Sequence, residues 1–232
     1  MPPPLLVIVA ARNEADRVGA TLDALRAAFP DAALWVGDDA SDDDTAAVAL
    51  VHGAQVVSRN KPHGKGGNVT AAAEAALSDP ESAEGRLVLV CDGDLGASAS
   101  ALAKLVGAVD RGECDLAVAA FSRRVGGGFG IALRFARWAI HSRSGFEAEA
   151  AISGQRAMRV EVLEAVLPFA SGYGMEIGMT VDAVRAGYRV CEVELDLEHR
   201  ATGRTLGGFM HRGRQLRDFA RVWWARRGGG AG

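Results

Sequence analysis

The sequence predicts an α/β protein with a doubly wound, mostly parallel sheet flanked by helices. Two observations predict this fold class. Short apolar runs rich in β-branched residues are continuous, as in strands buried on both faces, and these runs alternate with segments of helical period. The chain has 232 residues, of which 49% are hydrophobic and 24% are charged. That length and composition allow one large core, so we expect a single domain over residues 1–227 and a disordered tail over 228–232.

The first half of the chain repeats strand, helix and strand. Four strands are expected from continuous apolar runs, at residues 5–10, 33–36, 55–58 and 87–91. Helices are expected between them at residues 12–29, 45–51 and 69–77. In the first helix Val18, Leu22 and Leu25 recur every three or four positions, which places them on one face. The segment 59–68 is predicted to be a glycine-containing loop before the third helix.

The second half of the chain is less regular. Glycines at residues 123–130 predict a flexible loop, and an amphipathic helix is expected at 131–140. A further helix is expected at 175–186, closed by Gly187, before a strand at 190–195.

Composition and charge exclude several classes of function. A formal net charge of −3 gives no general attraction for nucleic acid, so a nucleic-acid partner is not expected. Cys91, Cys114 and Cys191 show no CxxC spacing, and three cysteines cannot all pair, so reduced and buried thiols are expected. The N-terminal apolar run is too short for a signal peptide or a membrane span. These features predict a cytoplasmic protein.

Polar clusters follow three of the expected strands, at residues 12–14, 38–39 and 92–94. In open parallel sheets the ligand crevice lies beyond the carboxyl ends of the strands. We therefore expect the three clusters to meet at one edge. Asp92 and Asp94 stand two positions apart just after a buried strand, where they could bind one divalent cation. The alternative is a solvated loop with two acids.

Two further segments carry candidate binding residues. Gly64 and Lys65 precede an expected helix, so the backbone amides and the lysine ammonium could meet phosphate oxygens. The alternative is a surface turn, and neither a Walker loop nor a GxGxxG motif is present. Asp38 or Asp39 could accept a hydrogen bond from a base or a ribose. Ser41 or Asp42 is expected to cap the following helix instead.

Four ordered motifs, VIVAARNE, VGDDASDDDT, NKPHGKGGNV and LVCDGDLG, resemble the nucleotide-binding half of a GT-A glycosyltransferase, particularly family 2. The resemblance is strong over residues 5–105 and looser over 106–227, the acceptor-side half. It implies a Rossmann-like GT-A fold and Mg²⁺ or Mn²⁺ held by Asp92 and Asp94. It also implies that Lys65 contacts the diphosphate and that Asp38 or Asp39 contacts the base. The implied lining of the nucleotide pocket is Ala10, Ala11, Arg12 and Glu14. Ala40 replaces the glycine of the commoner DDGS pattern.

In the second half, AISGQRAMRVEVLEAV and GYGMEIGMTVDAVRAGY resemble acceptor-side motifs of polyprenyl-phosphate sugar transferases and of glucosyl-3-phosphoglycerate synthases. The resemblance implies that the helix at 175–186 brings Glu176 toward the crevice, where its carboxylate would position a substrate or act as a base. The alternative is an acid favoured by the helix dipole. His199 is the implied third metal ligand. The remaining implied substrate-binding residues are Gly154, Gln155, Tyr173, Arg200 and Arg204.

The resemblance implies a metal-dependent transferase that moves a sugar from a uridine or guanosine diphosphate sugar to a phosphate-bearing acceptor, polyprenyl phosphate among the candidates. A phosphoglycerate acceptor is the alternative, although Leu197 and Ala201 depart from that group's pattern. A sugar-nucleotide pyrophosphorylase and a silent nucleotide-sugar-binding module are two further alternatives. A homodimer is compatible with the sequence.

The C-terminal segment is expected to form a helix with Leu216, Phe219, Val222 and Trp223 on one apolar face beside several arginines. This face could rest on the inner surface of an anionic membrane as a peripheral contact. The favoured alternative is packing against the protein's own domain.

Overall fold

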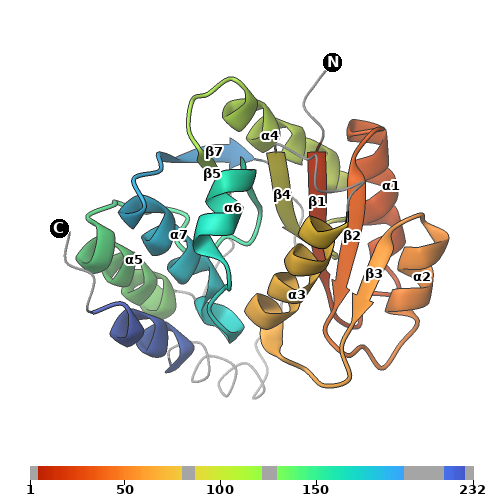
Figure 1. The fold of residues 1–232 in the computed structure, drawn as a ribbon, viewed down its shortest axis with the longest axis horizontal. Coiled ribbons are helices and arrows are strands. Elements are labelled where there is room, and N and C mark those ends of the chain that lie inside the picture. Colours follow the sequence, from red (N-terminus) through yellow and green to blue (C-terminus); the bar gives the residue numbers. More distant parts are fainter. Residues whose placement is uncertain (1–4, 80–86, 122–129, 196–216, 228–232) are drawn as a thin grey trace.

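The computed structural model of the chain describes residues 5–79, 87–121, 130–195 and 217–227. A seven-stranded mixed sheet of order β3-β2-β1-β4-β6-β5-β7 runs through it (Figure 1). The strands are β1 (Leu5–Ala11), β2 (Ala33–Asp38), β3 (Gln55–Ser58), β4 (Leu87–Asp92), β5 (Leu116–Phe121), β6 (Arg156–Arg159) and β7 (Val190–Leu195). Every pairing except those of β6 is parallel, which confirms the predicted mostly parallel sheet.

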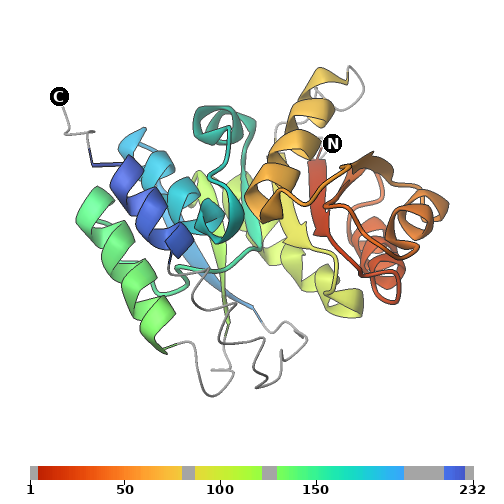
Figure 2. The same ribbon diagram turned by 90° about the horizontal axis from the view of Figure 1, so that it is seen from below.

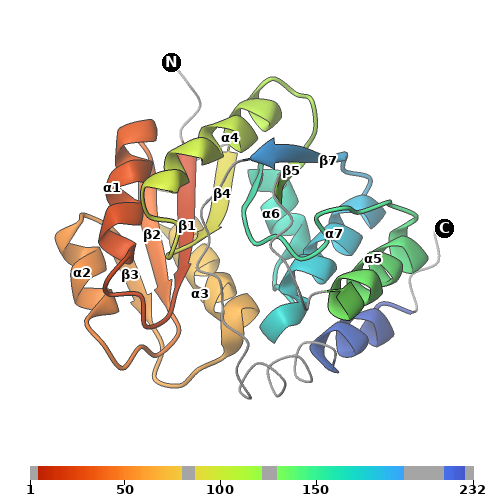
Figure 3. The ribbon, with the colours of Figure 1, turned by 180° about the vertical axis from the view of Figure 1, so that it is seen from behind.

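The helices lie on both faces of the sheet. They are α1 (Val18–Ala28), α2 (Thr45–Val51), α3 (Gly64–Ser78), α4 (Ala103–Asp110), α5 (Gly130–Ser144), α6 (Val160–Val166) and α7 (Met175–Arg185), with the 3₁₀ helices η1 (Gly96–Leu102) and η2 (Gly172–Gly174). Residues 217–225 form one more helix, called the C-terminal helix below. Figure 1 shows α3 and α6 over one face, and Figure 3 shows α1 and α4 over the other.

Side-chain alternation along β1 explains why both faces are covered. Val7 and Val9 pack with residues of α1, η1 and α4, whereas Leu6 and Ile8 pack with residues of α3, α6 and α7. All four side chains are buried. A strand that is apolar on both faces buries its whole surface only between two layers of helices.

The register of the central strands brings three chain segments to one edge of the sheet. Ala11, at the end of β1, pairs with Asp38 of β2, and Ala10 pairs with Asp92 of β4. Since β5 and β7 also run parallel to β4, β7 ends at Leu195 on the same edge. This arrangement confirms that polar clusters after β1, β2 and β4 meet at the carboxyl edge.

Two local expectations near this edge were wrong. The segment 64–68 is not a loop before α3 but the first turn of α3 itself, which begins at Gly64. The predicted capping residues of α2, Ser41 and Asp42, do not cap it. Instead the carboxylate of Asp43 accepts a hydrogen bond from the amide of Thr45 at 3.0 Å.

The expectation of three reduced cysteines was also wrong. Cys114 and Cys191 form a disulfide, because the parallel pairing of β5 with β7 brings together residues 77 positions apart. Cys91 is a free and buried thiol, as expected. Burial raises its pKa, and the neighbouring Asp92 carboxylate acts in the same direction.

The C-terminal helix packs against the protein's own domain, which confirms the favoured interpretation of that segment. Phe219 and Val222 are buried among residues of α5 and α7 such as Ile177. Figure 2 shows the helix lying beside α5, at the end of the molecule away from α2. In the part of the chain described, no helix combines the length and the apolar character required to cross a membrane.

Candidate active site

The acid pair lies in a tight turn directly after β4. Asp92 is the last residue of that strand, and the second acid follows after Gly93. The Gly93 amide donates a hydrogen bond to the carbonyl of Ala10 at 2.9 Å. The buried hydroxyl of Thr21 donates to the Gly93 carbonyl and accepts from the Gly96 amide, each at 2.8 Å. Strand β1 and helix α1 therefore fix the turn that carries the two carboxylates.

Lys65 joins three elements at this edge. Its ammonium nitrogen lies 2.5 Å from Oδ1 of Asp92 and 3.3 Å from Oε1 of Glu176. Lys65 is the second residue of α3 and Glu176 is the second residue of α7, so two helix N-termini converge on the end of β4. Glu176 is only 8% exposed. The structure thus brings together three of the predicted site residues.

The charges at this cluster compensate one another. Burial alone would lower the pKa of the Lys65 ammonium, but the facing carboxylates of Asp92 and Glu176 reverse that effect and hold the pKa above its usual value. Lys65 is therefore a cation throughout the neutral pH range. Asp92, Asp94 and Glu176 supply three negative charges against the two positive charges of Lys65 and the buried Arg156, which leaves a net negative charge that would attract a further cation.

Gly154 and Gln155 orient the first acid. The side-chain amide of Gln155 donates a hydrogen bond to Oδ2 of Asp92 at 2.8 Å, opposite the oxygen that faces Lys65. Gly154 leaves the space that the lysine occupies, because a Cβ there would lie 2.1 Å from the Lys65 ammonium nitrogen and 3.0 Å from Oδ2 of Asp92. Both residues were predicted to bind substrate, and both lie against Asp92.

We expect Gly154→Ala to weaken nucleotide binding about tenfold while the protein stays folded. The added methyl group would displace the Lys65 ammonium, which is the mobile end of a flexible side chain, rather than backbone. Calorimetric titration with a nucleoside diphosphate measures the loss. Gly130→Ala is the matched control, since a Cβ at Gly130 meets nothing within 4 Å. Wild-type affinity in Gly154→Ala would show that the position of Lys65 is unimportant.

Asp39 holds the start of α3 against the end of β2. Its two carboxylate oxygens accept the backbone amides of His63 at 2.7 Å and Gly64 at 2.9 Å. These amides belong to the group that a helix N-terminus leaves without helical partners. Asp39 is itself buried. It therefore positions Lys65 at the site through the first turn of α3.

Asp38 organises the loop that follows β2. One of its oxygens accepts hydrogen bonds from both the amide and the hydroxyl of Ser41. Ser41 in turn accepts the amide of Asn13, from the loop after β1, at 2.9 Å. Ala40 has φ of +56°, a left-handed backbone that glycine adopts more readily. Ala40, which stands where the DDGS pattern has glycine, therefore adopts a glycine-like backbone.

The predicted nucleotide pocket residues lie along the same edge. Ala10 and Ala11 end β1, and Arg12 is exposed just beyond them. The backbone amide of Glu14 donates a hydrogen bond to the hydroxyl of Thr45 at 2.8 Å, which ties this loop to α2. The structure therefore gathers these residues with Asp38 and Asp92 at the carboxyl edge of the sheet.

Arg156 lies beside the site, and the sequence did not predict it as a site residue. It is fully buried in β6, donating from Nε to the carbonyl of Ser153 at 3.0 Å and from Nη1 to the hydroxyl of Thr180 at 2.9 Å. Burial lowers the pKa of its guanidinium to about 10, and the carboxylate of Glu176 acts in the opposite direction. Arg156 remains protonated at neutral pH and places a positive charge beside the first turns of α7. Its only sequence signal was an arginine next to Gln155.

Two carboxylates from Asp92 and Asp94 suit a divalent cation, which prefers oxygen ligands and tolerates a partly compensated negative site. Within the described ranges, no three His, Cys, Asp or Glu side chains converge as a metal centre. The predicted third ligand, His199, lies outside the described residues. So do Arg200, Arg204 and the side chain of Tyr173.

Comparison with known proteins decides the family. The sequence profile of Glycosyl transferase family 2 matches residues 6–167. The chain belongs to this family. An uncharacterized glycosyltransferase of Mycobacterium tuberculosis is 32% identical over 205 residues, covering 86% of this chain and 87% of the relative. Undecaprenyl-phosphate mannosyltransferase of Micrococcus luteus is 31% identical over 216 residues, covering 86% and 85%.

Solved structures agree with the family. Glucosyl-3-phosphoglycerate synthase of M. tuberculosis, in complex with Mn²⁺, uridine diphosphate and glucosyl-3-phosphoglycerate, superimposes with a TM-score of 0.77. It is 27% identical, with 99% of this chain and 82% of that chain covered. The same enzyme with Mn²⁺, uridine diphosphate glucose and glycerol 3-phosphate gives a TM-score of 0.75. The fold of this family 2 glycosyltransferase is therefore GT-A-like.

Proposed function

We propose that this family 2 glycosyltransferase moves a sugar from a uridine or guanosine diphosphate sugar to a polyprenyl phosphate, with Mg²⁺ or Mn²⁺ held by Asp92 and Asp94. The observation that carries the proposal is the convergence of Lys65, Asp92 and Glu176 at the carboxyl edge of the sheet. A cation and acids at that edge are the groups needed to bind a diphosphate together with a metal.

The chemistry requires stabilisation of a leaving diphosphate. Breaking the bond between the anomeric carbon and the phosphate oxygen builds negative charge on the two phosphates. A divalent cation at Asp92 and Asp94 would supply Lewis-acid stabilisation of that charge. Lys65 contributes a second positive charge, which its contacts hold in place before the donor arrives.

Glu176 is the carboxylate best placed to act on the acceptor or on the sugar. It enters the site from α7 and faces Lys65, and it is not part of the acid turn after β4. In this position it can orient an acceptor or take the proton from an acceptor hydroxyl. A phosphate acceptor, already ionised at neutral pH, needs the orienting role more than the basic one.

The choice of polyprenyl phosphate as the acceptor rests on similarity to one relative of known activity. Undecaprenyl-phosphate mannosyltransferase matches most of both chains by sequence. The second candidate is a phosphoglycerate acceptor, favoured by the superposition on glucosyl-3-phosphoglycerate synthase. Leu197 and Ala201 depart from the pattern of that group, so we place polyprenyl phosphate first.

We expect one donor to raise the melting temperature in the presence of Mn²⁺ or Mg²⁺. At a concentration of about 100 times Kd, binding to the native state contributes about 2.7 kcal/mol, or about 5–10 °C for a chain of this length. Thermal denaturation with uridine and guanosine diphosphate sugars measures the shift. Lys65→Ala should largely remove it, whereas Lys104→Ala, at an exposed position on α4, should retain it. No shift with any donor would contradict the proposal.

Product analysis then separates the alternative reactions. A transferase with a matching acceptor, tested as short-chain polyprenyl phosphate and as 3-phosphoglycerate, releases a nucleoside diphosphate. A pyrophosphorylase instead forms or consumes pyrophosphate. Donor binding without turnover on any acceptor would identify a silent binding module.

A further inference from the structure

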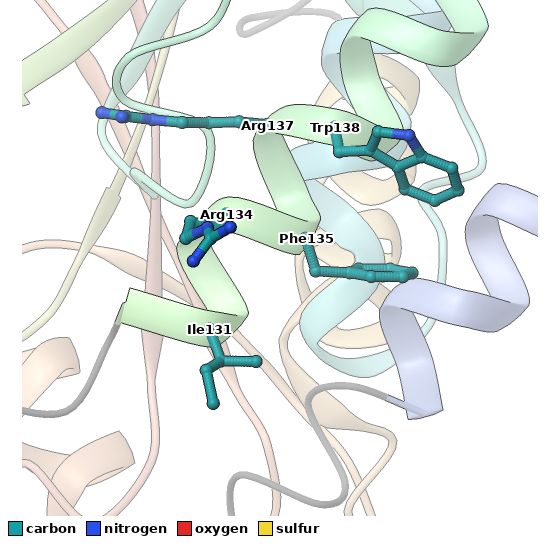
Figure 4. Close-up of a pocket in the computed structure, with 5 residues that line it drawn as sticks. All are labelled: Ile131, Arg134, Phe135, Arg137 and Trp138. Carbon is teal, nitrogen blue, oxygen red and sulfur yellow. The ribbon is translucent and has the colours of Figure 1, made fainter.

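The outward side of α5 combines apolar and basic side chains around a shallow hollow. Ile131, Arg134, Phe135, Arg137 and Trp138 line this hollow, whose volume is about 540 Å³ (Figure 4). Figure 4 shows Phe135 and Trp138 directed toward the C-terminal helix, with Arg134 and Arg137 directed away from it. Ile131 is 76% exposed and Trp138 is 48% exposed. We call these five residues the α5 face.

The C-terminal helix extends the α5 face with more aromatic surface. Trp138 packs on Trp223 with ring centroids 5.1 Å apart, and Trp223 contacts Trp224 at 6.4 Å. Trp224 is 58% exposed, and the guanidinium of Arg227 lies 3.0 Å from the centroid of its ring. Both tryptophans of the C-terminal helix therefore contact a guanidinium, since Arg143 of α5 also lies 4.1 Å from the ring centroid of Trp223.

The charge of this region differs from that of the whole chain. Helix α5 carries three arginines and no acid. Residues 217–227 carry four arginines and one acid, Asp218, so the two segments together have seven arginines against one acid, a formal charge of +6. The complete chain has a formal net charge of −3. Three acids lie beside these segments: Glu147 and Glu149 in the loop after α5, and Asp182 of α7, which forms an ion pair with Arg226. They lower the formal charge from +6 to +3 and do not reverse its sign.

We propose that the α5 face, extended by Trp224, docks onto an anionic lipid bilayer. Exposed tryptophans prefer the interface between water and lipid, where the ring is buried and its N–H stays hydrated. Arginines on the same surface are attracted to anionic headgroups, by about fivefold in binding per residue. Charge complementarity therefore favours a bilayer over a second copy of this chain, which would oppose like charges.

The position of the α5 face fits the proposed acceptor, and to this extent the inference rests on the proposed function. Helix α5 follows β5, and β5 runs parallel to β4, so β5 ends at the edge that carries Asp92. Eight residues connect that edge to the first residue of α5. A bilayer against the α5 face would hold the enzyme at the surface in which a polyprenyl phosphate is embedded.

Co-sedimentation with vesicles tests the docking directly. We expect the full chain to bind vesicles of mixed phosphatidylglycerol and phosphatidylcholine, and to bind phosphatidylcholine vesicles at least about tenfold more weakly. The variants Ile131→Ser with Trp224→Ser, and Arg134→Glu with Arg227→Glu, should each lose at least about tenfold in binding to the mixed vesicles.

Matched controls come from other parts of the surface. Leu50→Ser with Val51→Ser removes two apolar side chains that are 60% and 85% exposed on α2, at the opposite end of the molecule. Arg111→Glu reverses an exposed charge after α4. Both controls should bind mixed vesicles like the wild type. Equal losses in the controls, or wild-type binding by the α5-face variants, would overturn the proposal.

The outcomes also separate this inference from the proposed function. Donor binding in the thermal assay, measured without vesicles, should be the same in the α5-face variants and in the wild type. Vesicle binding by a protein that transfers no sugar would support the docking surface and contradict only the function. Absence of vesicle binding would contradict the docking surface. So would a homodimer in solution that the same variants dissociate, since the face would then be buried between two copies.

Discussion

Replacing Asp92 by Asn is expected to reduce sugar transfer by about 10²–10³-fold, equivalent to about 2.7–4 kcal/mol of lost transition-state stabilisation. The substitution preserves the shape of the side chain but removes the charge that faces Lys65 and that would hold the metal. The amide can still contact Gln155 after rotation, so the fold should survive. Steady-state kinetics with and without added Mn²⁺ measures the effect.

Asp94→Asn should give a loss of similar size, because the second acid of the turn would contribute the other carboxylate. In the part of the chain described, Asp94 makes no hydrogen bond or ion pair, so a purely structural role predicts no effect for this variant. Asp110→Asn, at an exposed position that ends α4, is the matched control. Full activity in both Asp92→Asn and Asp94→Asn would refute the metal assignment. For Asp92→Asn, whose native carboxylate contacts Lys65 and Gln155, loss of the folded state, checked by circular dichroism, would indicate a structural acid instead.

Glu176→Gln is expected to lower kcat by about 10²-fold while nucleotide affinity changes little, because an ionised phosphate acceptor needs the orienting role of this carboxylate. Glutamine keeps the volume of this nearly buried side chain but removes the negative charge that would orient the sugar or the acceptor at the reacting centre. Lys65 retains its shorter contact with Asp92, which explains why donor binding should persist. Single-turnover kinetics and calorimetric titration separate the two effects.

A second acid in the chain tests the alternative that Glu176 only stabilises the N-terminus of its helix through the helix dipole. Glu161 stands in the first turn of α6, as Glu176 stands in the first turn of α7, but it is exposed. If interaction with the helix dipole were the whole role, Glu161→Gln and Glu176→Gln would each cost about 0.3–1 kcal/mol of stability and leave kcat unchanged. A harmless Glu176→Gln would therefore support the helix-end role.

Much of the fold could be predicted because its strands are apolar on both faces. The bounds of α2, β3 and β7 were predicted to the residue, and β1, β2 and β4 differ only at their carboxyl ends. Strand β6 gave no such signal, since it has four residues, two of them arginines, and its antiparallel pairing depends on β4 and β5. A strand of this kind is defined by its neighbours rather than by its own pattern.

The candidate site was predictable as a set of residues but not as a geometry. Spacing identified Asp92 and Asp94, and motif order identified Lys65 and Glu176. The contact of Lys65 with both Asp92 and Glu176 depends on three elements far apart in the sequence. The early start of α3 has a similar cause, because the carboxylate that binds the amides of His63 and Gly64 comes from Asp39. Local propensity carries no information on such long-range contacts.

The central claim is that the turn after β4 holds a metal against the diphosphate of the donor. Anomalous diffraction at the manganese edge, from crystals grown with Mn²⁺ and a bound donor or nucleoside diphosphate, tests it most directly. The account predicts one strong peak within coordination distance, about 2–2.5 Å, of carboxylate oxygens of Asp92 or Asp94 and of a phosphate oxygen. A nucleotide bound at this edge with the manganese elsewhere, or with both carboxylates turned away from it, would contradict the account.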